Sequence, residues 1–417
     1  MVSTLVVVGL LVAAFVGFNI GGSSTGVAFG PAVGSRLVRK ATAATLFTLF
    51  AFLGAWTVGR NVIATMSDGI VPAVQFSPLA TVGVLFFTGL ALLLSNLYGV
   101  PASTSMTAVG AIVGLGLATD SLNEALMFTI VSAWIVAPLL GFATGAIVGR
   151  YLYPQLEAQM SFTRFERHLV QLDRSGRVPR LHLNTNAAPR DLVGSFLVIA
   201  IACYMGFSAG ASNAANAVAP LVGNGSITIE QGIVLAVAAI GLGGFTIARR
   251  TLATVSDGIT DLPILAALVV SSIGATIITV LSYLGIPASL AVSTTCCIIG
   301  LGWGRASRAA TLAEIATRRT ERELAARLTT GALAASTGSD DEPTSPTIGE
   351  LASSTAGERT GRRDRDRPVP PIGEEHIDEL SAESLFDPAA TRRIVILWIL
   401  APSLSVVGSY LLFSLLL

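Results

Sequence analysis

Charged residues are scarce in this chain. Asp, Glu, Lys and Arg make up 12% of the 417 residues, and Lys40 is its one lysine, whereas a soluble domain carries about 25% charged residues. The hydrophobic fraction is 52%, in apolar runs that recur along most of the chain. Because a single run of about 20 residues would suffice for one anchor, the recurrence predicts a polytopic membrane protein. A formal net charge of zero provides no field to attract nucleic acid.

Residues that form disulfides or bind metals are also few. The cysteines are Cys203, Cys296 and Cys297, and the chain has three histidines. Adjacent cysteines make a poor disulfide, and no Cys/His spacing is typical of a zinc site. No Ser/His/Asp set, metal cluster or acid pair falls within the apolar runs. The sequence therefore predicts neither an enzyme nor a resident metal.

Ten apolar segments are separated by polar stretches. They fall at 2–35, 41–58, 77–97, 101–118, 125–149, 193–222, 231–247, 262–283, 287–304 and 394–417. Each could span a membrane as a helix, and segments broken by glycine could instead be re-entrant. The first is interpreted as a span and not as a cleaved signal peptide, because no basic residue precedes its apolar run.

Two stretches in this series are copies of each other. Residues 18–34 and 207–223 share Phe, Gly, Ala, Pro and Gly at positions 189 apart. Three shorter pairs repeat in the same order: 65–70 with 254–259, 99–103 with 285–289, and 112–116 with 298–302. Since each half has five segments, the second half must enter the membrane from the opposite side. We expect an all-α polytopic membrane protein with two inverted-topology repeats of about five helices each and broken or re-entrant helices at the centre.

The charge distribution predicts the orientation and the domains. Arginine is concentrated in alternate loops and in the polar stretch, which the positive-inside rule assigns to the cytoplasm, with the N-terminus outside. We expect membrane repeat 1 at 1–153, a basic cytoplasmic linker at 154–192, and repeat 2 at 193–304 with a final helix at 392–417. Between the parts of repeat 2, a cytoplasmic helix and a disordered acidic insertion are expected at 305–391. This organisation predicts a multi-pass plasma-membrane protein surrounded by lipid, with a homodimer left open.

The polar groups at membrane depth are those of Ser, Thr and Asn. No Asp, Glu, Lys, Arg or His lies within the ten apolar segments, so a carboxylate proton relay is not expected. Helix breaks at the repeated stretches would expose backbone N–H groups at positive helix ends, and hydroxyls and amides add donors. That inventory suits an oxyanion, and unwound carbonyls could hold a nearby Na⁺.

The run 101–105 holds the densest cluster of hydroxyls. Its proline favours a helix start, which would put three hydroxyls in the first turn. Taken singly, each hydroxyl can equally bond back to its own helix or allow close helix packing. The repetition of such clusters in both halves favours binding. Asp68 and Asp257, in paired Ser-Asp-Gly turns, are expected to cap or turn a loop.

These motifs resemble the inorganic phosphate transporter (PiT) family of sodium- or proton-coupled permeases, which carry a Gly-Ala-Asn-Asp-Val-Ala-Asn motif in each half. Residues 210–217 are similar to the second copy and 21–35 to the first, while 101–106 and 110–114 are similar to two later blocks. The motif Asp falls on Ser24 and Asn213. The resemblance implies secondary active transport of inorganic phosphate by alternating access at a midplane site, coupled to Na⁺ or H⁺.

The repeats and the resemblance together predict the substrate-binding residues Ser23, Ser24, Thr25, Ser103, Thr104, Ser105, Ser212, Asn213, Asn216 and Ser289. Any Na⁺ is expected near Ser24, Asn213 and Asn216. Phosphate near pH 7 keeps a proton and benefits from an acceptor such as Asp, whereas sulfate needs donors only. A site of Ser, Thr and Asn suits sulfate at least as well, so a sulfate permease is the alternative within this class. The alternative outside it is a non-transporting anion sensor that signals through 305–391.

Overall fold

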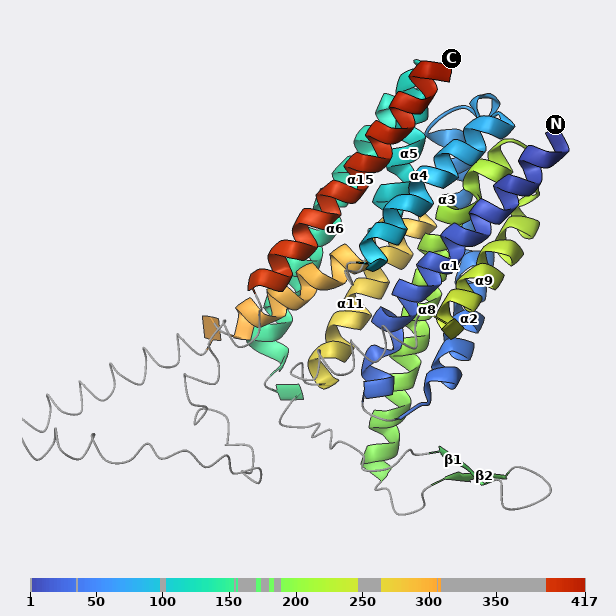
Figure 1. The fold of residues 1–417 in the computed structure, drawn as a ribbon. Coiled ribbons are helices and arrows are strands. Elements are labelled where there is room, and N and C mark those ends of the chain that lie inside the picture. The colour runs from blue at the N-terminus through green and yellow to red at the C-terminus, as the bar shows by residue number, and fades with distance from the viewer. Residues whose placement is uncertain are drawn as a thin grey trace, which may run out of the picture. The chain divides into compact units, whose positions relative to one another are not determined.

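The computed structural model is a bundle of long helices (Figure 1). It describes residues 2–34, 37–97, 103–153, 155–156, 170–173, 180–183, 189–246, 264–305, 307–308 and 388–416. The bundle belongs to one unit, residues 1–306 with 382–417, and 307–381 form a second unit. The predicted insertion at 305–391 and the repeated turn at Asp257 lie almost wholly outside the described residues.

The helices follow the order of the apolar segments. They are α1 (Val2–Gly34), α2 (Lys40–Thr57), α3 (Gly59–Ala64), the π-helical turn η1 (Thr65–Gly69), the 3₁₀ turn η2 (Ala73–Gln75), α4 (Pro78–Leu97), α5 (Thr104–Ala118), α6 (Glu124–Ile147), the π-helical turn η3 (Val148–Leu152), α8 (Pro189–Gly223), α9 (Ile229–Thr246), α11 (Ile264–Tyr283) and α15 (Pro388–Leu416). Residues 290–305 form a further helix after α11. The polar and proline-containing breaks in the sequence therefore predict the helix ends to within a few residues for most segments.

A short antiparallel hairpin interrupts the predicted polar linker. Strand β1 (Val170–Asp173) pairs with β2 (Arg180–Leu183), with Val170 opposite Leu183. The all-α prediction is right for the bundle and wrong for this hairpin. The linker was predicted from its charge alone, whereas the alternation of apolar and polar residues in its two runs favours strands.

Ten spans are not supported by helix length. Among the described residues, seven helices are long and apolar enough to cross a membrane, and an eighth span results if α2 is joined to the segment 59–69, which is bent from it by 63°. Helix α5 is shorter, at 15 residues, and the helix 290–305 is of similar length. Both are preceded by a proline-containing segment, which favours re-entry over a full crossing.

The predicted helix breaks at 18–34 and 207–223 are wrong. Helices α1 and α8 run continuously through both stretches. Some polar side chains there bond to their own helix, since Ser23 Oγ donates to the Ile20 carbonyl at 3.1 Å and Thr25 Oγ1 donates to the Gly21 carbonyl at 2.8 Å. The glycines serve helix packing instead of a break.

The two matching halves pack crosswise. Helix α1 packs against α9 and α2 packs against α8, and a methyl group on Gly21 would overlap the Ile240 carbonyl. The equivalent contact, Gly210 against the Ala51 carbonyl, is equally close. Helices α1 and α8 run antiparallel, because Gly9 near the start of α1 lies against Leu221 near the end of α8. The two helices that carry the copied stretches thus run in opposite directions.

The two short helices, α5 and 290–305, also pack across the halves. Helix α5 packs against α15, where a methyl group on Gly110 would lie 3.0 Å from the Pro402 carbonyl oxygen. The helix 290–305 packs against α6, where a methyl group on Gly141 would lie 2.8 Å from the Ser293 carbonyl oxygen. Each short helix is therefore supported by a long helix from the other half.

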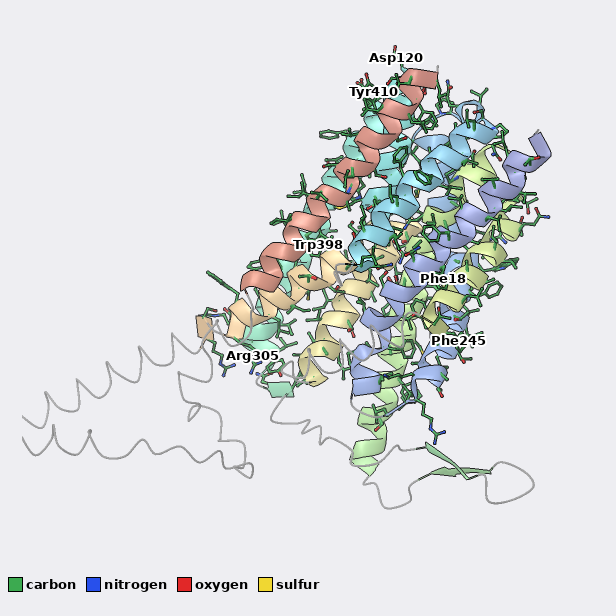
Figure 2. The ribbon with its side chains drawn as sticks, viewed as in Figure 1. Phe18, Asp120, Phe245, Arg305, Trp398 and Tyr410 are labelled. Carbon is green, nitrogen blue, oxygen red and sulfur yellow. The ribbon has the colours of Figure 1, made fainter. Side chains whose placement is uncertain are left out.

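Charged side chains lie toward the ends of the bundle. Figure 2 shows Asp120 at one end and Arg305 at the other, and the Arg305 guanidinium stacks over the Tyr153 ring at 4.5 Å. Between the ends, the outer faces carry large apolar side chains such as Phe128 and Leu139, which are 77% and 61% exposed. An apolar girdle with charged ends is the pattern of a membrane-embedded bundle.

Candidate functional site

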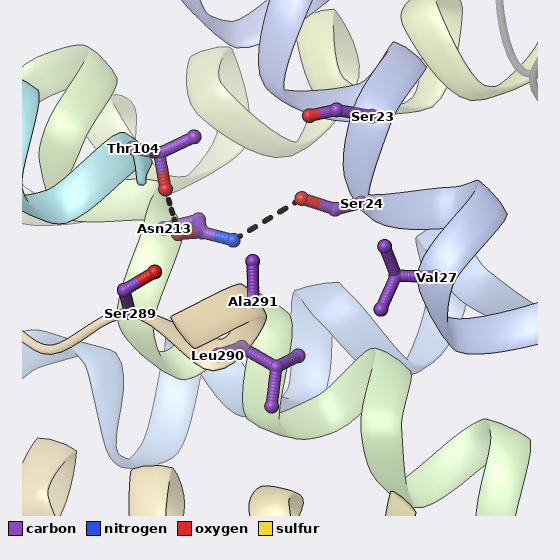
Figure 3. A pocket seen from close by; sticks show the side chains of 8 residues that line it. All are labelled: Ser23, Ser24, Val27, Thr104, Asn213, Ser289, Leu290 and Ala291. Carbon is purple, nitrogen blue, oxygen red and sulfur yellow. Dashed lines mark hydrogen bonds between the residues drawn. The ribbon is translucent and has the colours of Figure 1, made fainter. Parts of the chain in front are cut away.

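Two helix N-termini meet in the middle of the bundle. Helix α5 starts at Thr104, and the helix after α11 starts at Leu290. Both starts line one small cavity, together with residues from α1 and α8 (Figure 3). The lining residues are Ser23, Ser24, Val27, Thr104, Asn213, Ser289, Leu290 and Ala291.

The cavity is suited to negative charge. The first-turn N–H groups of a helix have no partner within that helix, and the helix dipole makes its N-terminus positive. None of the lining side chains carries a carboxylate that would oppose an anion. The space open to the centre of a water-sized sphere is about 20 Å³, room for about one water molecule. A larger oxyanion would therefore enter only as the side chains around the cavity separate.

Asn213 links three helices at the cavity. Its Oδ1 accepts a hydrogen bond from Thr104 Oγ1 of α5 at 2.6 Å. Its Nδ2 donates to Ser24 Oγ of α1 at 3.3 Å. Ser24 and Asn213 occupy equivalent positions in the two copies, so this contact crosses the seam between the halves. An entering ligand must compete with these two hydrogen bonds.

A second layer of polar groups lies behind Asn213. The Asn216 Nδ2 group is 3.2 Å from Asn213 Oδ1 and 3.3 Å from Ser105 Oγ. The hydroxyls of Ser105 and Ser212 both donate to the Ala288 carbonyl, at 3.0 and 2.6 Å. Asn216 Oδ1 is buried and accepts no hydrogen bond from the described residues. This layer ties the start of α5 to α8 and to the segment before the helix 290–305.

The two serines that precede the short helices behave differently. Ser289 Oγ accepts from the Val292 N–H at 3.4 Å, the hydrogen bond expected of an N-cap. Ser103 occupies the N-cap position of α5 without a side-chain cap, and its hydroxyl is buried with no partner among the described residues. The start of α5 thus keeps its first-turn donors free of a side-chain cap.

The structure brings most of the predicted residues together, but not all. Ser24, Thr104, Asn213 and Ser289 line the cavity, and Ser105, Ser212 and Asn216 form the layer behind it. Ser23 lines the cavity while its hydroxyl bonds back to α1. Thr25 points away, toward Gly244 of α9. Asp68 accepts from the Ala73 N–H at 2.7 Å, which confirms its predicted role in a turn.

Functional candidates outside the predicted set support this site. Asn96 Nδ2 of α4 donates to the carbonyl and to Oδ1 of Asn19, each at 3.1 Å, one turn before Ser23. Trp134 Nε1 donates to the Pro287 carbonyl at 2.7 Å. The signal for Trp134 was present, because Trp134-Ile-Val-Ala-Pro138 recurs as Trp398-Ile-Leu-Ala-Pro402. The predicted repeats covered the first four segments of each half, and this match lies in the fifth.

A metal centre built from His, Cys, Asp or Glu is not found in the described part of the chain, where no three such residues cluster. The described cysteines Cys203, Cys296 and Cys297 are unpaired. The site therefore offers hydroxyls, amides, backbone N–H groups and carbonyls as its chemical groups.

Comparisons with known proteins agree with this architecture. The family described as the phosphate transporter family matches residues 20–335. A relative named sulfate permease CysP, from Bacillus subtilis (strain 168), is 30% identical over 71% of this chain and 77% of its own length. A putative phosphate permease of Haemophilus influenzae is 26% identical over 72% of this chain and 88% of its own length.

A solved structure titled "The sodium-dependent phosphate transporter" has a similar fold, with a TM-score of 0.62, 18% sequence identity and 99% coverage of both chains. The family match covers well over half of the sequence, and the solved structure supports the fold along its whole length. The chain therefore belongs to the phosphate transporter family, as a multi-pass membrane transporter and not an enzyme.

Proposed function

We propose that this protein transports an inorganic tetrahedral oxyanion across the membrane, with sulfate preferred to phosphate. The observation that carries the proposal is the cavity where two helix N-termini meet Asn213, Ser24 and Thr104 without a carboxylate. Backbone N–H groups, hydroxyls and the Asn amide would surround a divalent anion with donors. A fully ionised sulfate needs no acceptor from its site.

Phosphate is the second candidate. It is the substrate that the family resemblance implies, and the family description and the Haemophilus relative both name it. The proton that phosphate keeps near pH 7 would need an acceptor. Asn213 Oδ1 already accepts from Thr104 and Asn216, so a phosphate proton would have to displace one of these donors. The relative named as a sulfate permease supports the ranking.

Alternating access between two inverted repeats is the proposed mechanism. Repeat 1 would comprise 1–153, and repeat 2 would comprise 193–304 with 392–417. Support comes from the antiparallel α1 and α8 and from the crosswise glycine contacts between the halves. A site on the seam can be exposed to either side when one repeat tilts against the other. The orientation with the N-terminus outside, the plasma-membrane location and a homodimer remain part of this proposal.

Coupling would use Na⁺ in preference to a proton relay. The oxygens near the cavity belong to hydroxyls, amides and carbonyls, and Asn216 Oδ1 has no partner among the described residues. Hard cations such as Na⁺ accept oxygen ligands of this kind. The predicted Na⁺ near Ser24, Asn213 and Asn216 remains a prediction.

Uptake by the purified full-length chain in proteoliposomes tests the proposal. Radiolabelled sulfate and phosphate are supplied with and without an inward Na⁺ gradient at fixed pH, and each is competed with the other. We expect saturable sulfate uptake, weaker competition by phosphate, and stimulation by Na⁺. If neither anion is taken up or competes, the proposed substrate is wrong. A chain lacking 336–391 should keep its uptake, whereas the sensor alternative predicts anion binding without transport.

A further inference from the structure

The side chain of Trp134 reaches from α6 to the segment that precedes the helix 290–305. Its indole Nε1 donates a 2.7 Å hydrogen bond to the Pro287 carbonyl. Pro287 lies in the non-helical segment 286–289, which joins the end of α11 to the helix 290–305. Trp134 itself does not line the cavity. Its contact is with the backbone that leads into the cavity, two residues before Ser289.

Three carbonyls around this segment are held by donors from other helices. The Tyr283 carbonyl accepts from Asn61 Nδ2 at 2.7 Å. The Ala288 carbonyl accepts from the hydroxyls of Ser105 and Ser212. Together with the Trp134 bond, donors from α3, α5, α6 and α8 converge on one short stretch of backbone. Such convergence fixes a segment that has no regular hydrogen bonding of its own.

The segment determines where the second helix N-terminus points. Ser289, Leu290 and Ala291 follow it directly and line the cavity. Neither Leu290 nor Ala291 has a polar side chain, so this side of the cavity can address an anion through its first-turn N–H groups and the Ser289 hydroxyl. The direction of those N–H groups depends on the backbone that Trp134 holds.

We infer that Trp134 is a positioning residue for the anion, because its indole N–H sets the backbone from which the helix 290–305 begins. The inference rests on the proposed transport of an oxyanion. Pro287 is buried, and a buried carbonyl that loses its donor is costly unless the segment shifts to find another. A shift moves the helix N-terminus relative to the anion and weakens its binding.

The predicted signature is a change in KM with little change in maximal rate. Loss of the indole N–H should raise the KM for sulfate about tenfold, the change that corresponds to one hydrogen bond of ordinary strength. The maximal uptake rate should stay within about twofold. A purely structural role for the ring would instead lower the amount of folded protein and the maximal rate together.

Two variants of the full-length protein separate the N–H group from the ring. Trp134→Phe removes the donor and part of the ring. Replacement of Trp134 by 3-benzothienylalanine keeps the ring size and replaces the N–H by sulfur. Both should raise the KM. Trp303 is 65% exposed and provides the matched control, since Trp303→Phe and the same replacement at 303 should leave KM unchanged. A wild-type KM for the benzothienylalanine protein would overturn the inference.

Hydrogen–deuterium exchange provides a readout that does not depend on transport. In lipid nanodiscs, peptides covering 283–292 should exchange faster in both Trp134 variants than in wild type, while peptides from the middle of α1 should be unchanged. Unchanged exchange at 283–292 in both variants would overturn the inference. If the wild-type protein takes up neither sulfate nor phosphate, the proposed function fails, and the exchange measurement still decides the role of Trp134.

Discussion

The two halves of this transporter are alike in packing and unlike at the site. Gly21 meets the Ile240 carbonyl as Gly210 meets the Ala51 carbonyl. The halves differ at the N-terminal residues of the two short helices, α5 and 290–305, which we call the tips. Thr104 is the tip of the first half, and Leu290 is the equivalent tip of the second. The first tip donates from a side-chain hydroxyl to Asn213. The second tip lines the same cavity with an apolar side chain.

A duplicated scaffold therefore does not require a duplicated site. Helix packing constrains backbone distances, so equivalent glycines are needed where α1 approaches α9 and where α8 approaches α2 most closely. An anion bound in the cavity, as proposed, would need only enough donors around it, which one polar tip and two helix N-termini can provide.

The largest effect is expected at the glycine contacts. Gly21→Ala and Gly210→Ala each place a methyl group inside the carbonyl of a neighbouring helix, and backbone cannot yield as a side chain can. Each should destabilise the bundle by about 3 kcal/mol or more, seen as loss of monodisperse protein in detergent and a lower thermal midpoint. Gly206→Ala is the control, because its nearest neighbours would be at 3.5 Å. A large difference between Gly21→Ala and Gly210→Ala would contradict the equal packing of the halves.

Asn213→Asp should change which anion is preferred. A carboxylate at this position would accept the proton of phosphate and repel fully ionised sulfate. We expect the ratio of sulfate to phosphate uptake to fall about 100-fold, equivalent to about 2.7 kcal/mol. Asn224→Asp is the matched control, since Asn224 lies in the loop after α8 and bonds to Thr81 at 2.8 Å. An unchanged ratio in Asn213→Asp would show that this residue does not contact the anion.

The two tips should respond unequally to matched changes. Thr104→Val keeps the shape and removes the hydroxyl that donates to Asn213, so the KM for sulfate should rise about tenfold. Leu290→Met at the equivalent position keeps the volume and should change KM less than about twofold. Initial uptake rates over a range of sulfate concentrations measure both. An equal change in KM in the two variants would contradict the expected difference between the two tips.

The smallest effect is expected at an ion pair that joins the two halves and has no counterpart in the repeat. Arg60 bonds to Glu230 at 2.9 Å and stacks over Trp56 at 4.7 Å, while Ala41 occupies the position equivalent to Glu230. Both charged side chains are exposed to solvent, at 35% and 51%, so Arg60→Gln should lower the thermal midpoint only slightly. Thermal midpoints of the variant and the wild type at low and high salt check this, and the two proteins should differ less at high salt. A loss of folding would assign this pair a structural role.

The sequence predicted the helices better than it predicted their breaks. Segment ends followed from polar and proline-containing interruptions, as for α4 at Pro78–Leu97. The breaks predicted at 18–34 and 207–223 were wrong. Gly and Ser, which weaken a helix in isolation, also allow helices to pack closely. Ser23 and Thr25 satisfy their hydroxyls within α1, which sequence alone cannot distinguish from ligand binding.

The site was predictable only in part from the polar runs of the repeated stretches. Thr104 directly follows the repeated run 99–103, Asn213 lies in the repeated stretch 207–223, and both line the cavity. Thr25 lies in the equally polar run 23–25, but its hydroxyl bonds back to Gly21 and it faces α9. Trp134 acts through a backbone carbonyl 153 positions away in sequence, a contact that depends on how α6 crosses the second half. Such a contact follows from tertiary packing and not from a local motif.

The cavity between Thr104, Asn213 and Leu290 is proposed to bind a tetrahedral oxyanion. Selenate has the shape and charge of sulfate, and its selenium atom scatters X-rays anomalously. Crystals of the full-length protein grown with selenate should show one anomalous peak in this cavity, and the peak should be displaced by excess sulfate. A selenium peak elsewhere in the bundle, or none at a concentration that blocks sulfate uptake, would contradict the claim.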